Sequence, residues 1–212
     1  MKSEISLLLK WNDFLNYPAR YAEPSHIQFL YPDIRDKQLD AFLRTKSGTE
    51  VLSRRLLRDL RLDGGQFDPD GLDRPGARLA LLDRETIWQI GLTAALLSYA
   101  QVLKTFVLKR QLAPILKAVG PHNYRLAAGM VADGLDADVP QRHGFDLEAW
   151  RTHAGDLISL WMQTLTEPVR RRVALKFPRA FGPAMVVRTP QAMVGFQTVC
   201  DAKVDQCLAT IH

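Results

Sequence analysis

The sequence predicts an all-α protein, a compact multi-helix globular domain with an irregular N-terminal arm. Three observations predict this class. Apolar residues recur at the three- and four-residue spacing of a helix in almost every segment. The one strand-like stretch is only two residues long, Val186-Val187. Hydrophobic residues make up 47% of the 212 residues, which is enough to bury a sizeable core.

The chain is expected to begin with a short segment through Trp11 and Phe14, followed by an irregular arm over Asn16–Pro24. Pro18 and Pro24 lie too close together for a regular helix between them, because each proline disfavours helical backbone in the residue before it. Tyr17 and Tyr21 supply apolar rings that are expected to pin the arm onto the core.

Three helices are expected to follow the arm. Ser25 is predicted to cap the first, with Gln28 at the spacing of a capping box. The second is expected around 35–44 and the third, after Ser47-Gly48-Thr49, over 49–62. We expect the second and third helices to bury Leu39, Phe42, Leu43, Val51, Leu52, Leu56, Leu57 and Leu60.

Residues 63–76 form the one long irregular segment, rich in glycine, proline and aspartate, each of which favours turns. A calcium loop starting at Asp68 is not supported, because the twelfth position is Leu79 where such loops have glutamate. We expect a surface loop here. The predicted organisation is one helical domain over 1–212, with a possible N-terminal subdomain 1–62, a loop 63–78 and a helical centre and C-terminal part 79–212.

The segment 79–119 is the predicted centre of the fold. No charged residue falls between Glu85 and Lys104. A helix is expected here, and apolar residues occupy nearly every face of it, which indicates burial. Asp83 is placed to cap it. We expect one break near 98–100 and another near 111–114, because a proline inside a helix costs about 3 kcal/mol. The segment is expected to end at Gly120-Pro121.

A membrane span is a weaker interpretation of the same segment. Polar residues interrupt it at Gln89, Thr93, Ser98 and Gln101, which suits a protein interior better than lipid. The N-terminus carries Glu4 and lacks the long apolar region of a signal peptide. The sequence has two cysteines and so no disulfide framework. Together these features favour a cytoplasmic protein.

Four helices are predicted after the centre. The first covers about 122–135. The second is the cleanest, with Asp146 as its cap and one continuous apolar stripe that includes Trp161. The third begins near Pro168 and carries the arginine run, and the last begins near Gln191.

We find no constellation that predicts catalysis, a cofactor or a metal. Cys200 and Cys207 are seven residues apart on one helix, too far for a disulfide or a shared metal. His122, His143 and His153 show no zinc-ligand spacing, and His153 is expected to be exposed. A phosphate loop, a dinucleotide fingerprint and a nucleophile elbow are absent from the sequence. We therefore expect no enzyme activity, no cofactor and no metal.

The net charge of +5 favours acidic partners. Basic residues form two separate clusters, each expected on a solvent-exposed helix face without interleaved stacking aromatics. We predict that these clusters contact partners. The first consists of Arg54, Arg55, Arg58 and Arg61, and the second of Arg170, Arg171, Arg172 and Lys176, followed by Arg179.

Three stretches in order along the chain resemble the SctK family of type III secretion proteins. The first is the arm Phe14-Leu15-Asn16-Tyr17-Pro18-Ala19-Arg20-Tyr21-Ala22-Glu23-Pro24-Ser25. The second is Leu81-Leu82-Asp83-Arg84, continued by Val107-Leu108-Lys109-Arg110 and Leu116-Lys117-Ala118-Val119-Gly120. The third is Trp150-Arg151, Gly155 and Trp161, then Arg172-Val173-Ala174-Leu175-Lys176-Phe177-Pro178. Glu23 stands where the family often has histidine, and Phe177 where it has leucine.

The resemblance implies a non-enzymatic adaptor of the sorting platform. Members of that family bridge the cytoplasmic domain of the inner-membrane ring protein SctD to the pod protein SctQ, which leads through SctL to the ATPase SctN. The implied location is the cytoplasmic face of the bacterial inner membrane. The family supplies no motif for either contact. Two alternatives remain open from the residues alone: a basic helical nucleic-acid-binding protein, and a small helical enzyme.

Overall fold

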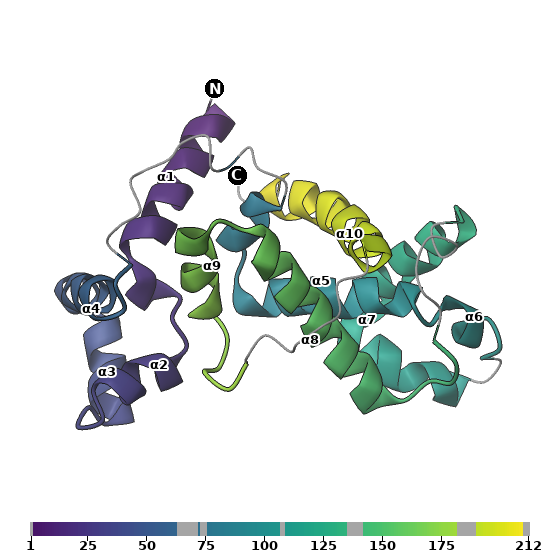
Figure 1. The fold of residues 1–212 in the computed structure, drawn as a ribbon, viewed down its shortest axis with the longest axis horizontal. Helices are drawn as coiled ribbons and strands as arrows, with labels where there is room; N and C mark the ends of the chain where they lie inside the picture. The colour runs from purple at the N-terminus through teal and green to yellow at the C-terminus, as the bar shows by residue number, and fades with distance from the viewer. Residues whose placement is uncertain are drawn as a thin grey trace. The chain divides into compact units, whose positions relative to one another are not determined.

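The computed structural model describes residues 2–62, 72, 76–106, 109–134, 142–181 and 190–209. The predicted all-α class is confirmed, because these residues contain ten α-helices and two short 3₁₀ helices and no strand (Figure 1). The strand-like Val186-Val187 and most of the predicted loop 63–76 lie outside the described residues. The α-helices are α1 (Lys2–Asn16), α2 (Pro24–Leu30), α3 (Asp36–Leu43), α4 (Lys46–Asp59), α5 (Arg84–Leu97), α6 (Ala100–Leu103), α7 (Lys109–Ala132), α8 (Leu147–Thr164), α9 (Glu167–Ala174) and α10 (Pro190–Ala209).

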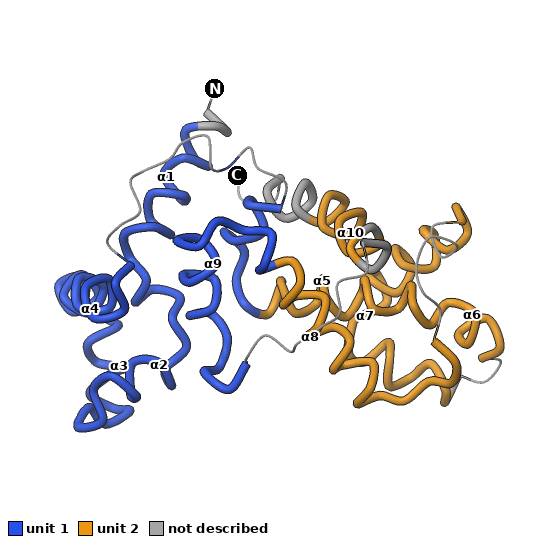
Figure 2. The backbone as a smooth tube through the Cα atoms, in the orientation of Figure 1, with its two compact units in different colours: residues 1–84, 162–182 blue, residues 85–161, 183–212 orange. Residues whose placement is uncertain are grey.

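The chain divides into two compact units, coloured separately in Figure 2. Unit 1 contains residues 1–84 and 162–182, and unit 2 contains residues 85–161 and 183–212. The division does not follow the expected boundary at the loop 63–78. A C-terminal segment that includes α9 belongs instead with the N-terminal helices.

Unit 1 is built around an apolar cluster that joins distant parts of the sequence. Ile27 of α2, Leu39 of α3 and Leu56 of α4 are almost fully buried in it, and Leu175, just after α9, joins them. Beside this cluster, Trp11 and Phe14 of α1 stack with ring centroids 5.5 Å apart. The arm after α1 contains only the 3₁₀ helix η1 (Pro18–Arg20), as the two prolines predict.

Two helix starts in unit 1 differ from the sequence expectation. Glu23, not Ser25, caps α2, because its carboxylate accepts the backbone N–H of Ser25 at 2.9 Å. Likewise, α4 starts at Lys46 instead of Thr49, since the Thr45 hydroxyl accepts the backbone N–H of Gly48 at 3.1 Å. A Cβ at position 48 would lie 2.2 Å from the Phe42 carbonyl oxygen, so this cap requires glycine.

The C-terminus of α4 ends in a Schellman motif without glycine. Arg61 has the left-handed φ of 51°, its N–H donates to the Arg58 carbonyl, and the N–H of Leu62 donates to the Leu57 carbonyl at 2.6 Å. The turn buries Leu62 and leaves Arg61 exposed.

Two residues that were expected in the core, Phe42 of α3 and Val51 of α4, lie instead on the surface, since Phe42 is 47% and Val51 is 38% exposed.

Unit 2 is centred on α5, as predicted. Its residues from Ile90 to Leu97 are all buried, and the helix breaks at Ser98 and Tyr99 before α6. Gly91 lets α8 approach closely, because a Cβ there would lie 2.8 Å from the Ile158 side chain. The Trp150 indole N–H of α8 also donates to the Leu92 carbonyl at 3.1 Å.

Three of the other predicted features of unit 2 are confirmed and one is wrong. Asp146 caps α8 by accepting the backbone N–H of Ala149 at 2.7 Å, and Trp161 is fully buried. Gly120 has non-helical angles, so α7 contains two helical segments that meet there, as the Gly120-Pro121 pair predicts. The expected break at 111–114 is wrong, because α7 begins at Lys109 and Pro114 lies inside it.

Within the described ranges, none of the helices combines the length and hydrophobicity that a membrane crossing needs.

Candidate functional site

The first basic cluster lies on the surface of unit 1, as predicted. Arg54, Arg55, Arg58 and Arg61 are all exposed, on α4 and on the turn that ends it. Of the second cluster, Arg171 is exposed and Arg170 is half-buried. The Arg171 guanidinium donates to the Arg61 carbonyl at 3.3 Å, so the exposed ends of the two clusters adjoin. The expectation of two separate faces is wrong. We call these six residues the α4/α9 basic face.

An aromatic side chain lies within this face, which the sequence interpretation missed. The Tyr31 hydroxyl donates to Asp59 Oδ2 at 2.6 Å, and Arg58 Nε pairs with Asp59 Oδ1 at 2.8 Å. The Arg55 guanidinium lies 5.8 Å from the centroid of the Tyr31 ring. Burial and the hydrogen bond to Asp59 raise the pKa of Tyr31 to about 12, and the hydrogen bonds from Arg58 and Tyr31 lower the pKa of Asp59. The face therefore presents guanidiniums held in place by one tyrosine and one carboxylate.

Arg172 is buried, which contradicts its predicted role as a partner contact. Its side chain is 2% exposed and donates from Nε to the Leu15 carbonyl at 3.0 Å and from a terminal nitrogen to the Leu62 carbonyl at 2.5 Å. A third bond goes to the Pro168 carbonyl at 3.0 Å. Leu15 lies in the last turn of α1, and Leu62 closes the α4 turn, so Arg172 supplies donors to carbonyls at two helix ends.

Lys176 is also buried, again contrary to the prediction. It is 4% exposed, and its ammonium donates to the Ala80 carbonyl at 2.7 Å and to that of Leu82. Ala80 belongs to the 3₁₀ helix η3 (Ala77–Leu81), which ends just before Leu82. The ammonium also lies 5.2 Å from the ring centroids of both Phe14 and Tyr21. Burial lowers the pKa of Lys176 to about 8, with a smaller opposing effect from Asp83.

Two of the stretches that carry the family resemblance meet here. The backbone N–H of Glu23 in the arm donates to the Leu175 carbonyl at 2.7 Å, and His26 Nε2 lies 2.8 Å from the Phe177 carbonyl. These two contacts, together with the hydrogen bonds of Arg172 and the ring contacts of Lys176, place the segment 172–178 against the arm. Arg179, further along, is exposed, and its guanidinium lies 3.1 Å from the Phe29 ring centroid.

A separate polar cluster in unit 2 resembles a catalytic pair at first inspection. Ser98 Oγ lies 2.9 Å from His153 Nε2, and an Arg142 terminal nitrogen lies 3.3 Å from His153 Nδ1. His153 is half-buried, not exposed as predicted. Burial, with Arg142 adding to it, lowers the pKa of His153 to about 4, so the ring is neutral at pH 7.

The tautomer of His153 argues against nucleophilic catalysis at this pair. A guanidinium only donates, so Nδ1 facing Arg142 must be the acceptor nitrogen and the proton lies on Nε2. Nε2 then donates to Ser98 Oγ and has no lone pair with which to remove its proton, as a general base must. The geometry supports a structural role, in which Arg142 also donates its backbone N–H to the Ser98 carbonyl at 2.7 Å.

For metals, the described part of the chain has no group of three or more histidine, cysteine, aspartate or glutamate side chains that could hold an ion. Cys200 is buried, and burial raises the pKa of its thiol well above the ordinary value. The side chain of Cys207 and the calcium-loop candidate at Asp68 lie outside the described residues.

Comparison of the chain with protein-family models, with curated proteins and with solved structures finds no match.

Proposed function

We propose that this protein is a non-enzymatic adaptor of a type III secretion sorting platform, which binds an acidic partner surface through the α4/α9 basic face of unit 1. The resemblance to the SctK family supplies the partners: an SctD-like cytoplasmic domain and an SctQ-like pod protein, the latter connected through SctL to SctN. At work, the adaptor would lie at the cytoplasmic face of the inner membrane. The observation that carries the proposal is the α4/α9 basic face itself.

The geometry of that face supports recognition of a protein surface. Arginine is favoured at interfaces because its planar guanidinium binds carboxylates through two parallel bonds. Tyr31 and Asp59 already hold Arg55 and Arg58 in place, so less side-chain entropy is lost on binding. In the described part of unit 1, Arg54 has no ion pair, and its side chain is exposed to an incoming carboxylate.

The test is a charge reversal with a matched control. The variant replaces Arg54, Arg55 and Arg58 with glutamate, and the control makes the same change at three exposed basic residues of α7 in unit 2: Arg110, Lys117 and Arg125. Both change the net charge equally. Binding of the purified SctD-like domain and the SctQ-like protein from the same genome is measured by calorimetry, after circular dichroism has shown that each variant is folded.

We expect the α4 variant to lose at least about 100-fold in affinity for one partner, because like charges then face each other across the interface. The α7 variant should bind that partner like the unmodified protein. A single Arg54→Ala change should cost less than about 1 kcal/mol, as exposed charges usually do. Equal binding by the α4 and α7 variants would exclude the basic face. Failure of both partners to bind the unmodified protein would exclude the adaptor role.

Nucleic-acid binding is the second candidate, and one observation favours it. Tyr31 lies beside Arg55 and Arg58, and an aromatic ring among arginines can stack on a base. The two functions differ in salt dependence, because phosphate binding releases counterions and falls steeply with salt. Titration of labelled single-stranded and duplex DNA and RNA at several salt concentrations decides between them. A steep slope, lost in the α4 variant and retained in the α7 variant, would favour nucleic acid.

A further inference from the structure

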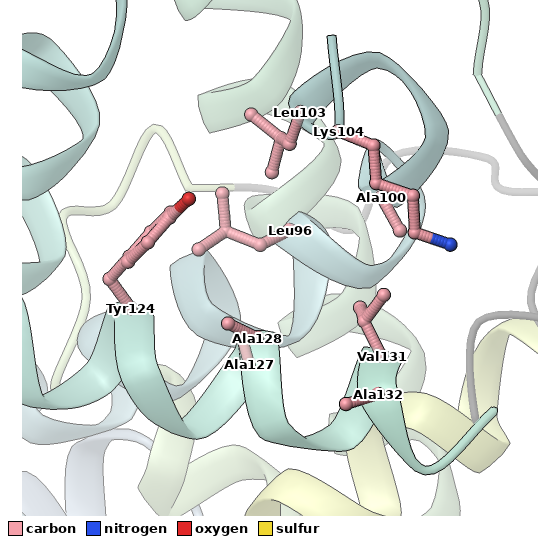
Figure 3. Close-up of a pocket in the computed structure, with 9 residues that line it drawn as sticks. All are labelled: Leu96, Ala100, Leu103, Lys104, Tyr124, Ala127, Ala128, Val131 and Ala132. Atoms are coloured by element: carbon pink, nitrogen blue, oxygen red, sulfur yellow. The ribbon is translucent and has the colours of Figure 1, made fainter. Parts of the chain in front are cut away.

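Unit 2 contains an apolar groove between α6 and the second half of α7 (Figure 3). Its volume is about 480 Å³, within the range of sites that bind ligands or partner side chains. Leu96, Ala100 and Ala127 are buried at its base. The remaining lining residues are Leu103, Lys104, Tyr124, Ala128, Val131 and Ala132.

The groove is open along its length. Ala128 and Ala132 are exposed, and Tyr124, Leu103 and Val131 are only half-buried. Binding sites for small molecules usually enclose most of their ligand, whereas a surface with exposed walls suits a partner that covers it. The small side chains of Ala127, Ala128 and Ala132 leave space between the helices, which forms the groove. The Tyr124 ring lies at one end of the lining residues of α7 (Figure 3).

The length of the groove matches a docking helix. On α7 the lining extends from Tyr124 to Ala132, and the rise between these two residues is about 12 Å at 1.5 Å per residue. Three apolar side chains at positions i, i+4 and i+7 of a second helix span about 11 Å. Helices that dock in grooves use this spacing of anchors.

The charge of the lining indicates the sign of the partner. Lys104 is the single charged residue among the groove residues and is exposed at the end of α6. A carboxylate on the partner helix beside the apolar anchors would meet this ammonium, and a lysine there would be repelled.

We propose that the α6/α7 groove is the docking site for an amphipathic helix of a partner protein, with apolar anchors along its axis and an acidic residue beside Lys104. This inference uses the groove alone, so it holds whichever partner binds the α4/α9 basic face. It assigns a binding surface to unit 2 in addition to the one proposed on unit 1.

The test uses two synthetic peptides and the full chain. Each peptide is a labelled amphipathic helix of about 18 residues, long enough to form a helix on binding, with leucine at i, i+4 and i+7. One peptide carries glutamate beside the leucine stripe and the other carries lysine at the same positions. Fluorescence anisotropy should show saturable binding of the glutamate peptide, about tenfold tighter than that of the lysine peptide.

Two variants with matched controls locate the binding. Ala128→Trp fills the groove and should lower the affinity for the glutamate peptide at least about tenfold. Ala41→Trp, at an exposed site of α3, should leave that affinity unchanged. Lys104→Glu should reverse the preference between the peptides, whereas Lys117→Glu, an equal change of charge on α7, should preserve it. Melting curves check that all four variants are folded.

Three results would overturn the proposal. The first is that the glutamate peptide does not saturate, or binds Ala128→Trp and Ala41→Trp equally. The second is that a fluorescent fatty acid saturates the groove and displaces no peptide, which would assign the hollow to an acyl chain. The third is that the unmodified protein dimerises in sedimentation while Ala128→Trp is monomeric, which would assign the groove to a second copy of the chain.

Discussion

Replacing Arg172 with methionine tests whether this cation stabilises unit 1. The guanidinium is buried and binds the carbonyls of Leu15, Leu62 and Pro168. Methionine keeps an unbranched apolar stem but removes every donor. The neighbouring Arg171 is exposed on the same helix, so Arg171→Met is a matched control with the same change of charge.

The expected loss follows from the carbonyls that are left behind. Pro168 lies one turn before Arg172 in α9, so its carbonyl keeps an acceptor role within the helix. The bonds to Leu15 and Leu62 are both buried, and each orphaned carbonyl costs about 1–3 kcal/mol. Relief of the desolvated guanidinium offsets part of this loss. We therefore expect Arg172→Met to cost about 3 kcal/mol and Arg171→Met less than about 0.5 kcal/mol.

Urea denaturation gives the difference in free energy, and hydrogen exchange gives its location. Because two compact units need not unfold together, the exchange of backbone amides in 1–62 and 162–181 is followed separately from that in 85–134 and 142–161. Exchange should accelerate in unit 1 for Arg172→Met. A loss of unfolding free energy below about 1 kcal/mol, or an equal loss in the two variants, would refute the reasoning and indicate that Arg172 is exposed in solution.

Three further predictions concern stability. Burial holds the pKa of Lys176 at about 8, below its unfolded value, so the unfolded chain binds more protons than the folded one between about pH 8 and 10.5. The free energy of unfolding should therefore rise by about 3 kcal/mol over this pH range. Urea denaturation at several pH values should show this rise in the unmodified protein and not in Lys176→Met, and an equal pH dependence of the two proteins would contradict it. Trp161 is fully buried with Phe196 at 6.4 Å, so Trp161→Ala should cost about 3–5 kcal/mol by denaturation, and a cost near zero would place it at the surface. Arg61 has φ 51°, so Arg61→Gly should leave stability unchanged or raise it by up to about 1 kcal/mol, with a fall in melting temperature as the contrary result.

The sequence predicts the helical features that local chemistry determines. The apolar stripe and Asp146 cap correctly predict α8, and Gly120-Pro121 correctly marks the interruption of α7. Caps with two candidate residues are harder, since both Glu23 and Ser25 can cap α2 and only the fold selects Glu23. Pro114 does not break α7, although it lies five residues after the first residue of that helix.

The candidate site was mispredicted where polar residues share a stripe with apolar ones. Val169, Arg172, Val173 and Lys176 are spaced at i, i+3, i+4 and i+7, which is the buried face of a helix, and all four are buried. His153 stands three residues after Trp150 and is half-buried for the same reason. The periodicity of these positions indicates a buried face, and it is a better guide here than the run of arginines, which is typical of a solvent-exposed face. The contact of Arg171 with Arg61 could not be predicted, because 110 residues separate them.

The positions of the two buried cations explain how unit 1 tolerates them. Helix C-termini expose carbonyls without partners and carry partial negative charge. Arg172 lies where α1 ends and where the turn after α4 closes, and Lys176 lies where η3 ends. The segment 172–178 therefore joins three helix ends and the arm through buried cations and backbone bonds.

This arrangement separates two roles that the sequence presents as one basic run. Arg172 and Lys176 belong to a stretch that resembles the SctK family, and their contacts are with the backbone and rings of unit 1. A resemblance carried by such residues concerns how the unit folds. Under the proposed adaptor function, partner choice would depend on residues that reach solvent, such as Arg54 and Arg171, because a buried side chain cannot contact a partner. Substitution of the buried pair should therefore reduce stability and binding together, whereas reversal of the exposed charges should reduce binding alone.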